Sequence, residues 1–484
     1  MLFHLAGTWS LPLIDRDEPR FAEASREMIQ RADYIVPHFN NQLRLDKPPL
    51  AYWAQVASYR IFGESDFGAR FPSAIAAALT ALVIVGWGYR IGAATVGRWA
   101  AIIFTLSLQT FVHAKAAVAD MWLVLFMTLA NWIGYELIRR PASHAQRPIF
   151  NSQWRLWWAF YLSLALGFLA KGPIAWMPLL TVLTTMVLTR DWQLARHFKF
   201  LRGILLTVGV VALWGIPALI QTHGQFFTIG IGRHVIGRSL ATMEGHGASS
   251  FGMYLLLLPF YFVTIFVSFF PWSIKLPWLI RQLRRQKKAG ISNAGYRGNE
   301  IDNYLLTGIA VIFVIFTLVS TKLPHYTLPA LPLLALLLAR HWQGAASATN
   351  HGSFRTIAAS AACVCIAIAL VVPPFVARFF PAYQLFRESH TYLQTNTQIA
   401  SVEFEEPSVV WYFRSRVQDF LTRLNKKNAV DFMSKSGPRF VIVPTSAVGT
   451  LFADPPPDWK IFSTRGFNVA KGKFVDLTLV LKPE

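Results

Sequence analysis

Two charged patterns lie at opposite ends of residues 15–68, between apolar stretches of sequence. Asp17 and Glu18 are adjacent carboxylates at the start of DEPR, and Asp46 stands beside Lys47 on a backbone stiffened by two prolines. Such groups suit acid–base and electrostatic chemistry, and carboxylates at a lipid boundary are costly without a task or a partner. The bland alternatives are a helix cap for the first pattern and a local ion pair for the second.

Further polar groups interrupt the apolar sequence at four later points. They are Asp120, Lys171 in the sequence LysGlyPro, Lys322 in the sequence KLPHY, and the residues Arg233, His234, Arg238, Glu244 and His246 of the segment 222–250. A lone intramembrane Asp can be a helix cap, and a lone His can be a satisfied interface group. Five separate loops that carry acids, bases and histidines are harder to explain as caps.

The composition predicts that most of the chain lies in a membrane. The 484 residues carry a net charge of +21, yet only 15% are charged and 54% are hydrophobic. A nucleic-acid-binding protein would carry its charge on a polar surface, so no nucleic-acid partner is expected. Cys363 and Cys365 are two residues apart within one apolar run, so on a helix they point to different faces and cannot pair.

Ten segments approach the roughly 20 apolar residues that a spanning helix needs. They are residues 69–89, 96–114, 117–138, 155–171, 173–190, 201–221, 251–273, 303–321, 326–340 and 355–378. Residues 1–14 are apolar but short for a span. They form either a short first helix or the remnant of a longer one, and we favour further apolar sequence upstream.

Every second connection between the apolar segments is rich in basic residues, and the connections between them hold nearly all the acidic ones. Arginine and lysine cluster in the connections 90–98, 139–155, 190–202, 275–297 and 340–355. The positive-inside rule makes these connections cytoplasmic, so residues 15–68 and the other alternate connections face the periplasm. We therefore predict a multi-pass protein of the inner (plasma) membrane with its polar chemistry on the outer side.

The composition changes after about residue 385. VEFEE, RFVIVP, WKIFS and FVDLTLVL are predicted as short strands, and Val409–Leu424 and Lys426–Ser436 as helices. The predicted organisation is a mainly α membrane domain, residues 1–384, followed by a small periplasmic α/β domain, residues 385–484.

Several of these motifs together resemble glycosyltransferase family 39. The matching segments are DEPRFAE (17–23), DKPPLAYW (46–53), Asp120 before a Met-containing helix, FLAKGP (168–173) and KLPHYTLPALP (322–332). This family has the GT-C membrane architecture and includes the aminoarabinose transferase ArnT and the protein O-mannosyltransferases. The similarity extends over about residues 15–340 and is weaker in the C-terminal domain.

The resemblance implies a sugar donor carried on a polyprenyl phosphate and no required cofactor. Asp17 corresponds to the catalytic acidic residue, which would accept the proton of an attacking hydroxyl and give inversion, with Asp120 and Glu18 as supporting carboxylates. Lys47 corresponds to a lysine that binds the leaving phosphate. The other candidates for the donor site are Arg233, Arg238, Tyr326 and Lys322.

The sequence also departs from the family pattern. Position 46 is Asp where ArnT relatives usually have Glu, position 44 is Arg where they often have Tyr, and Phe21 replaces the commoner Tyr. The resemblance suggests a divalent metal such as zinc held by Asp46 with His234 or His246. Because Asp is shorter than Glu, hydrogen-bonded histidines are the alternative.

The favoured function is transfer of one sugar to an acceptor in the outer leaflet, such as lipid A modified with 4-amino-4-deoxy-L-arabinose. A protein O-mannosyltransferase-like activity is the alternative within the family. A non-catalytic transporter of lipid-linked sugars is an alternative of another class, but transporters usually show repeat symmetry and broken helices, and neither is evident in the sequence.

Overall fold

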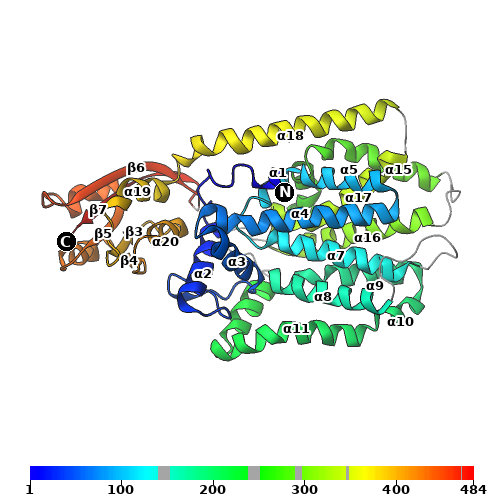
Figure 1. Ribbon diagram of the computed structural model, residues 1–484, viewed down its shortest axis with the longest axis horizontal. Coiled ribbons are helices and arrows are strands. Elements are labelled where there is room, and N and C mark those ends of the chain that lie inside the picture. Colours follow the sequence, from blue (N-terminus) through cyan, green and yellow to red (C-terminus); the bar gives the residue numbers. More distant parts are fainter. Residues whose placement is uncertain (140–152, 238–250, 289–296, 345–347, 470, 484) are drawn as a thin grey trace.

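A computed structural model describes residues 1–139, 153–237, 251–288, 297–344, 348–469 and 471–483. An elongated helix bundle makes up one part of the molecule, and the C-terminal residues form a smaller sheet domain at one end of it (Figure 1). The longer bundle helices are α4 (Asp66–Ile91), α5 (Ala94–Thr105), α7 (Asp120–Ile138), α8 (Gln153–Lys171), α9 (Met177–Thr189), α11 (Phe200–Gln221), α15 (Leu276–Lys288), α16 (Arg297–Leu318), α17 (Leu331–Gly344) and α18 (Ala348–Ala377).

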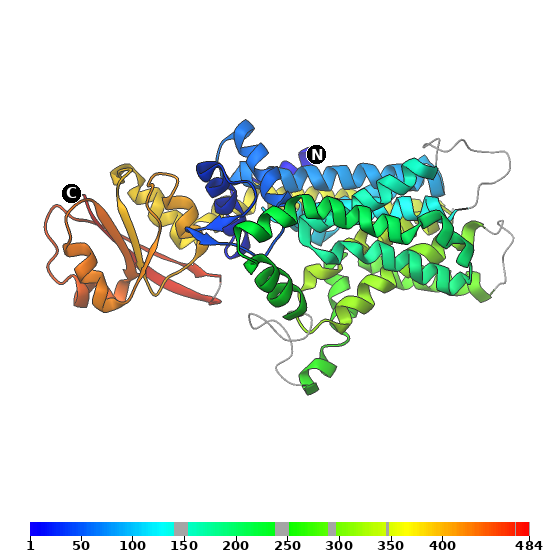
Figure 2. The ribbon, with the colours of Figure 1, turned by 90° about the horizontal axis from the view of Figure 1, so that it is seen from below.

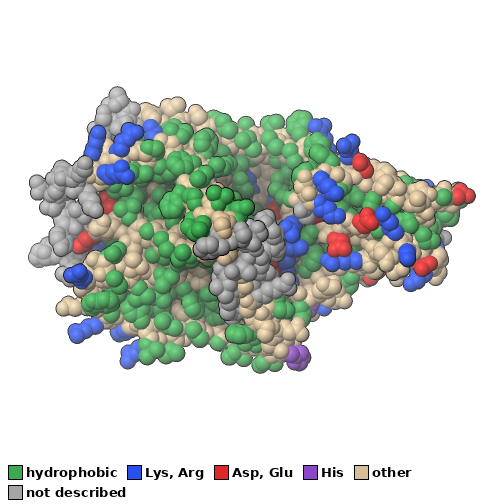
Figure 3. All heavy atoms as spheres, turned by 180° about the vertical axis from the view of Figure 1, so that it is seen from behind, with side chains coloured by type: hydrophobic (Ala, Val, Ile, Leu, Met, Phe, Trp, Pro, Cys, Tyr) green, Lys and Arg blue, Asp and Glu red, His purple; other side chains and the backbone are tan. Residues whose placement is uncertain are grey.

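Every predicted apolar segment contains helix, and the chain is a multi-pass membrane protein. Among the described residues, five helices are long and apolar enough to span a bilayer by themselves, and a bent pair would make a sixth. Shorter helices complete the bundle: α1 (Leu2–Leu5), α6 (Leu108–His113), α10 (Ala195–Phe198), α13 (Phe251–Leu256) and α14 (Phe260–Ser268). Figure 3 shows the corresponding broad hydrophobic surface over the bundle.

Several segments predicted as single helices are broken. Residues 251–273 form α13, α14 and the 3₁₀ turn η4 (Trp272–Lys275), and α14 meets the following helix at 116°. Pro259 precedes α14 and Pro271 precedes η4, where the absence of a backbone donor breaks the hydrogen-bond ladder. Residues 326–340 likewise comprise η5 (Pro324–Ala330) followed by α17. These breaks within the apolar segments were not predicted from the sequence.

The remaining short elements of the bundle lie at the ends of its helices. They are η1 (Pro173–Trp176), η2 (Trp192–Leu194) and the π-helical η3 (Phe226–Gly237).

The segment 15–68 folds against the end of the bundle that faces the sheet domain (Figures 1 and 2). It contains α2 (Asp17–Arg31), the short hairpin β1 (His38–Phe39) and β2 (Gln42–Leu43), and α3 (Leu50–Phe62). Helix α2 is followed by Ala32 in the left-handed conformation, which caps its C-terminus. The polar segment is therefore a folded cap over the bundle.

The C-terminal domain is a five-stranded mixed sheet of order β4-β3-β5-β7-β6. Its strands are β3 (Gln398–Val402), β4 (Thr422–Leu424), β5 (Arg439–Pro444), β6 (Lys460–Asn468) and β7 (Lys473–Lys482). Its helical elements are α19 (Pro381–Ser389), η6 (His390–Tyr392), α20 (Pro407–Phe413), α21 (Lys426–Ser434) and α22 (Thr445–Leu451).

Two predictions for this domain were wrong in detail. The first strand is QIASV rather than VEFEE, because the alternation of Phe404 with acids resembles a strand although the buried run ends at Val402. The predicted helix Val409–Leu424 stops at Phe413, and its last residues form β4, which pairs with β3. The domain boundary at residue 384 stays a prediction, since α19 crosses it.

Buried ion pairs dock the sheet domain onto α2. The Arg414 guanidinium contacts Glu23, lies 3.3 Å from Glu27 Oε1 and donates to Gln30 at 2.9 Å. Arg26 pairs with Glu23 at 2.7 Å and lies 3.8 Å above the Trp411 ring centroid. Burial raises the pKa of Glu23, although both arginines oppose that shift. The docking of the two parts therefore depends on mutually neutralising charges.

We expect Arg414→Ala to weaken this docking strongly, because it leaves Glu23 and Glu27 with less compensation in a buried site. Breaking a buried pair typically costs about 3–5 kcal/mol. Thermal unfolding midpoints and limited proteolysis of the detergent-solubilised protein measure the effect. Arg416→Ala removes the same charge from an exposed position two residues away and is the matched control. Equal midpoints and cleavage for both variants would contradict the docking role.

Candidate active site

The buried pair Glu18–Arg70 holds the start of the polar segment in place. All five donors of the Arg70 guanidinium are used: two bond to Glu18 at 2.7 and 2.9 Å, and three bond to backbone carbonyls of Thr8, Leu11 and Pro12. Glu18 also accepts the backbone N–H groups of Ile14 and Ala117 at 2.7 Å. Glu18 was predicted as a catalytic carboxylate, but its oxygens are committed to these four bonds and its side chain is buried. We reassign Glu18 to positioning.

Asp17, the adjacent residue, has the opposite environment. It is exposed at the first turn of α2, where the helix dipole favours its negative charge. Burial would lower the pKa of Arg44, but Asp46, Tyr52 and Asp17 together raise it, so the charge of Asp17 acts on this guanidinium. Asp17 is thus an accessible carboxylate at the start of a helix.

Arg44, Asp46 and Lys47 form a compact charged group at the end of the same segment. Arg44 Nε donates to the Tyr52 hydroxyl at 2.8 Å and lies 3.3 Å from Asp46 Oδ1. Lys47 Nζ donates to the Asp46 carbonyl at 3.2 Å and lies 3.7 Å from Asp46 Oδ2. Two cations therefore share the Asp46 carboxylate.

A second charged group lies at the N-terminus of α7. Asp120 Oδ1 accepts a 2.5 Å bond from Lys171 Nζ at the end of α8, and His325 Nε2 in η5 lies 4.0 Å from the same oxygen. The His325 ring lies 5.3 Å from that of His113. Burial lowers the pKa of His325 to about 3 despite the attraction of Asp120, so its imidazole is neutral at neutral pH. The predicted Asp120 is thereby joined to Lys171, to which no role was assigned.

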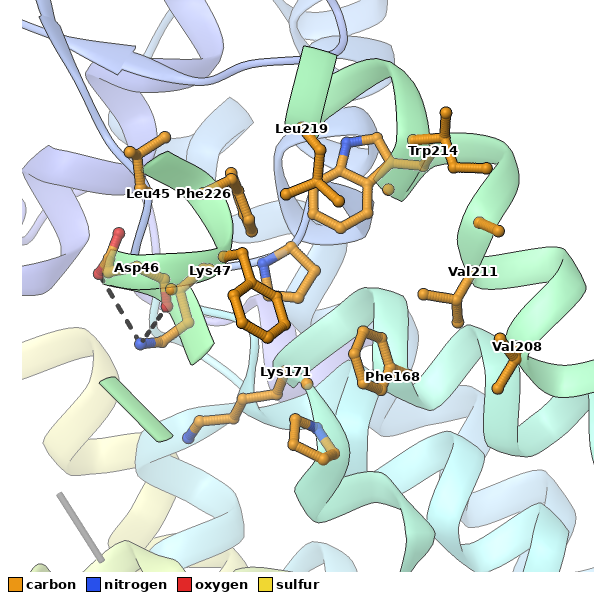
Figure 4. A pocket seen from close by; sticks show the side chains of 18 residues that line it. Leu45, Asp46, Lys47, Phe168, Lys171, Val208, Val211, Trp214, Leu219 and Phe226 are labelled. Carbon is orange, nitrogen blue, oxygen red and sulfur yellow. Dashed lines mark hydrogen bonds and ion pairs between the residues drawn. The ribbon is translucent and has the colours of Figure 1, made fainter. Parts of the chain in front are cut away.

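An apolar cavity of about 240 Å³ connects the two groups. Its walls come from Phe168 of α8, from α11 including Val211 and Trp214, and from Phe226 of η3, with Lys47 and Lys171 at one end. Figure 4 shows both ammonium groups on the same side, away from the aromatic wall. Paired cations at the mouth of an apolar cavity suit an anion that carries a hydrocarbon tail.

Tyr326 and Lys322 take different roles within one loop. The Tyr326 ring packs 4.7 Å from Phe316 and lines a small hollow with Asp120 and Lys171. Lys322 was predicted to bind phosphate, but its buried ammonium donates to the carbonyls of Phe316, Thr317 and Val319 at 2.6–3.1 Å. Because these bonds use all three of its donors, Lys322 caps the end of α16 instead.

Four predicted site residues fall wholly or partly outside the described part of the chain. Arg238 and His246 lie outside it, and Arg233 and His234 lie in η3 with side chains outside the described residues. Among the described residues, no group of three or more His, Cys, Asp and Glu side chains could hold a metal ion. Asp46, the predicted zinc ligand, lies beside Arg44 and Lys47, and the side chains of its predicted partners His234 and His246 fall outside the described residues, so the zinc site stays a prediction.

Sequence reasoning missed the importance of Arg70 and Lys171. Arg70 lies within the first spanning helix, where an intramembrane arginine is itself a signal of a specific partner. Lys171 ends an apolar helix, where a cation is common for reasons of the dipole alone. Only the fold brings it to Asp120.

The chain was compared with known families and proteins. Residues 11–231 match the family described as dolichyl-phosphate-mannose-protein mannosyltransferase. An undecaprenyl phosphate-alpha-4-amino-4-deoxy-L-arabinose arabinosyl transferase of Pectobacterium carotovorum is 29% identical over 73% of this chain and 59% of its own length. A second arabinosyl transferase, from Sodalis glossinidius, is 28% identical over 70% of this chain and 58% of its own. The chain thus spans less than two thirds of these relatives.

The fold has a solved counterpart. The crystal structure of ArnT from Cupriavidus metallidurans bound to undecaprenyl phosphate superposes with a TM-score of 0.77 at 16% sequence identity, covering 99% of this chain and 96% of that one. The mainly α, polytopic GT-C fold expected from the motifs is therefore confirmed, together with the small C-terminal sheet domain.

Proposed function

We propose that this chain, a GT-C membrane protein related to glycosyltransferase family 39, transfers a sugar from a polyprenyl-phosphate donor to an acceptor at the outer face of the membrane. The observation that carries the proposal is the apolar cavity with Lys47 and Lys171 at its mouth. A polyprenyl-phosphate sugar has an anionic phosphodiester head and a hydrocarbon tail, which matches that arrangement, and the phosphate gains a second negative charge when the sugar departs. The arabinosyl transferases named above and the ArnT bound to undecaprenyl phosphate support the same donor class.

Asp17 is the proposed base. The acceptor hydroxyl oxygen attacks the anomeric carbon while its proton passes to the Asp17 carboxylate, and attack opposite to the leaving group inverts the configuration. Asp17 is exposed, as a base that meets an external acceptor must be. Asp120 cannot easily share this role, because its Oδ1 is held by Lys171 at 2.5 Å. It is better suited to orienting Lys171.

Lys47 and Lys171 are the proposed electrophilic groups. As the bond between the anomeric carbon and the phosphate oxygen breaks, the electron pair stays on the departing polyprenyl phosphate, and fixed cations stabilise its growing charge. Arg44 contacts both oxygens of Asp46, so this carboxylate is shared between Arg44 and Lys47. Tyr326, Arg233 and Arg238 remain proposed donor-site residues. No metal is part of the proposal.

Lipid A is the proposed acceptor, and 4-amino-4-deoxy-L-arabinose the proposed sugar, on the strength of the arabinosyl transferase relatives. The family description of residues 11–231 favours protein mannosylation as a second candidate. A transporter of lipid-linked sugars would hold the same phosphate with these cations, but it would not need an exposed base. Lipid A and periplasmic glycoproteins from a deletion strain, analysed by mass spectrometry, distinguish these acceptors.

The proposed location is the inner membrane, with the site and the C-terminal domain in the periplasm. The basic connections support this sidedness by the positive-inside rule. We expect alkaline phosphatase fused after Pro381 to be active and the same enzyme fused near Gly290 to be inactive. Both fusions are compared at equal expression, and the reverse pattern would contradict a periplasmic site.

We expect Asp17→Asn to abolish turnover while donor binding is largely retained, because the amide keeps the size of the carboxylate but cannot accept the proton. The loss should be at least a hundredfold to a thousandfold, about 2.7–4 kcal/mol. Transfer from a synthetic polyprenyl-phosphate sugar by purified protein is the assay. Asp33→Asn is the control: it removes a charge from the same segment and keeps an oxygen for the bonds from Ile35 and Val36. Near-normal turnover of Asp17→Asn would remove the base assignment.

Lys47→Ala should weaken donor binding as well as turnover, because the cation contacts the phosphate both before and during transfer. The expected loss in kcat/KM is again about a hundredfold or more. Binding of polyprenyl phosphate alone, measured by titration, separates the two effects. Arg60→Ala removes an exposed cation from nearby α3 and should change neither quantity. Unchanged phosphate affinity in Lys47→Ala would contradict the assignment.

A further inference from the structure

A second cavity, of about 390 Å³, lies at the opposite end of the bundle from Lys47. Trp154, Trp157 and Trp158 from the first turns of α8 form one wall. The other wall is the connection from α10 to α11, which supplies Arg196, His197, Lys199 and Arg202. None of the described residues that line the cavity is acidic, and the nearby Asp191 is not among them.

The position of this cavity along the helices places it at a membrane surface. Helix α8 begins at the cavity and ends at Lys171 in the candidate active site. Its 19 residues correspond to about 28 Å, close to the thickness of the bilayer core. Figure 1 shows α10 at the end of the bundle farthest from the sheet domain. The two cavities therefore face opposite leaflets.

The tryptophans have the features of an interfacial site rather than of a packed core. The Trp157 indole N–H donates to the Phe198 carbonyl at 2.6 Å and so holds the turn that carries the cations. The Trp158 indole nitrogen is buried and has no hydrogen-bond partner among the described residues. Trp154 is 65% exposed. Indoles of this kind concentrate where hydrocarbon meets headgroups.

An apolar stripe leads away from the cations along α11. Leu201, Leu205 and Val208 follow at helical spacing and are 75%, 62% and 46% exposed. In a bilayer this stripe faces acyl chains. A ligand held by Arg202 and Lys199 would therefore have its polar head in the cavity and its hydrocarbon along α11, which distinguishes a lipid from a free anion.

We propose that this cavity binds the phosphate headgroup of an anionic glycerophospholipid, such as phosphatidylglycerol, from the leaflet opposite to the candidate active site. Three permanent cations surround the cavity, and basic pockets between membrane helices on the cytoplasmic side recognise such headgroups. The site is independent of the proposed transfer reaction.

The test is retention of defined lipids by the purified, delipidated full-length protein, measured by native mass spectrometry. The probes are phosphatidylglycerol, phosphatidylcholine, undecaprenyl phosphate and inorganic phosphate. The substitution Arg196→Gln/Lys199→Gln/Arg202→Gln should weaken phosphatidylglycerol binding on the order of a hundredfold, since each cation near the surface is worth roughly fivefold. Trp158→Phe replaces the bicyclic indole of the cavity wall with a smaller ring and also removes its N–H, so it should weaken phosphatidylglycerol binding a few-fold. Both variants must elute as monodisperse protein with an unchanged unfolding midpoint.

The matched control is Arg281→Gln/Arg284→Gln/Arg285→Gln, which removes three exposed arginines from α15 without touching the cavity. We expect it to bind phosphatidylglycerol like the unmodified protein. Equal loss in both triple variants would reduce the site to general surface charge and overturn the proposal. Three other results would also overturn the proposal. They are equal binding of phosphatidylcholine and phosphatidylglycerol, loss of undecaprenyl phosphate binding alone in the triple variant, and displacement of phosphatidylglycerol by millimolar inorganic phosphate. If the triple variant unfolds, unaltered binding by Trp158→Phe counts against the site.

Discussion

The ion pair between Glu18 and Arg70 is the contact on which the arrangement of the site depends. Arg70 lies within a spanning helix, and its guanidinium is satisfied by Glu18 and by three carbonyls of the chain that leads to α2. Glu18 in turn binds the backbone of Ala117, three residues before Asp120. Burying two charges in this way is favourable only because every donor and acceptor is used. The pair thereby fixes both Asp17 and the start of α7.

The two carboxylates of the site differ because their surroundings differ. Asp17 immediately precedes the buried Glu18 but is itself exposed, so it is accessible to an external hydroxyl. Asp120 is buried beside Lys171 and His325, and its charge holds that lysine at the mouth of the apolar cavity. The two aspartates therefore have different surroundings: Asp17 is open to solvent, and Asp120 holds a cation in place.

The sequence predicted the membrane helices and the fold, but it did not predict which charged side chains bond to one another. Apolar length and the alternation of basic loops predicted the membrane helices, and the motif order around Asp17, Lys47 and Asp120 predicted the fold. Lys322 and Glu18 were placed in the site because their motifs contain them, whereas their side chains bond to a helix end and to Arg70. The bonding partner of such a side chain is the group that lies within about 3 Å of it in the folded chain. No local sequence pattern encodes that neighbour. The prolines within residues 251–273 could have predicted the helix breaks there, but hydropathy averaged over a window conceals them.

The sheet domain bears on the site through its contacts with α2 and with the residues that lead into α2. Arg414 pairs with Glu23 and Glu27 in the middle of α2, and Trp411 packs against Arg26 of the same helix. Asp17 lies in the first turn of this helix. The Tyr412 hydroxyl accepts the backbone N–H of Leu13, so the residues that enter α2 are also held by this domain. A helix fixed at its entry by Arg70 and along its length by Arg414 has little freedom to rotate. The position of the proposed base is therefore set jointly by a membrane helix and by a domain outside the membrane, although the two are separated by more than 300 residues of sequence.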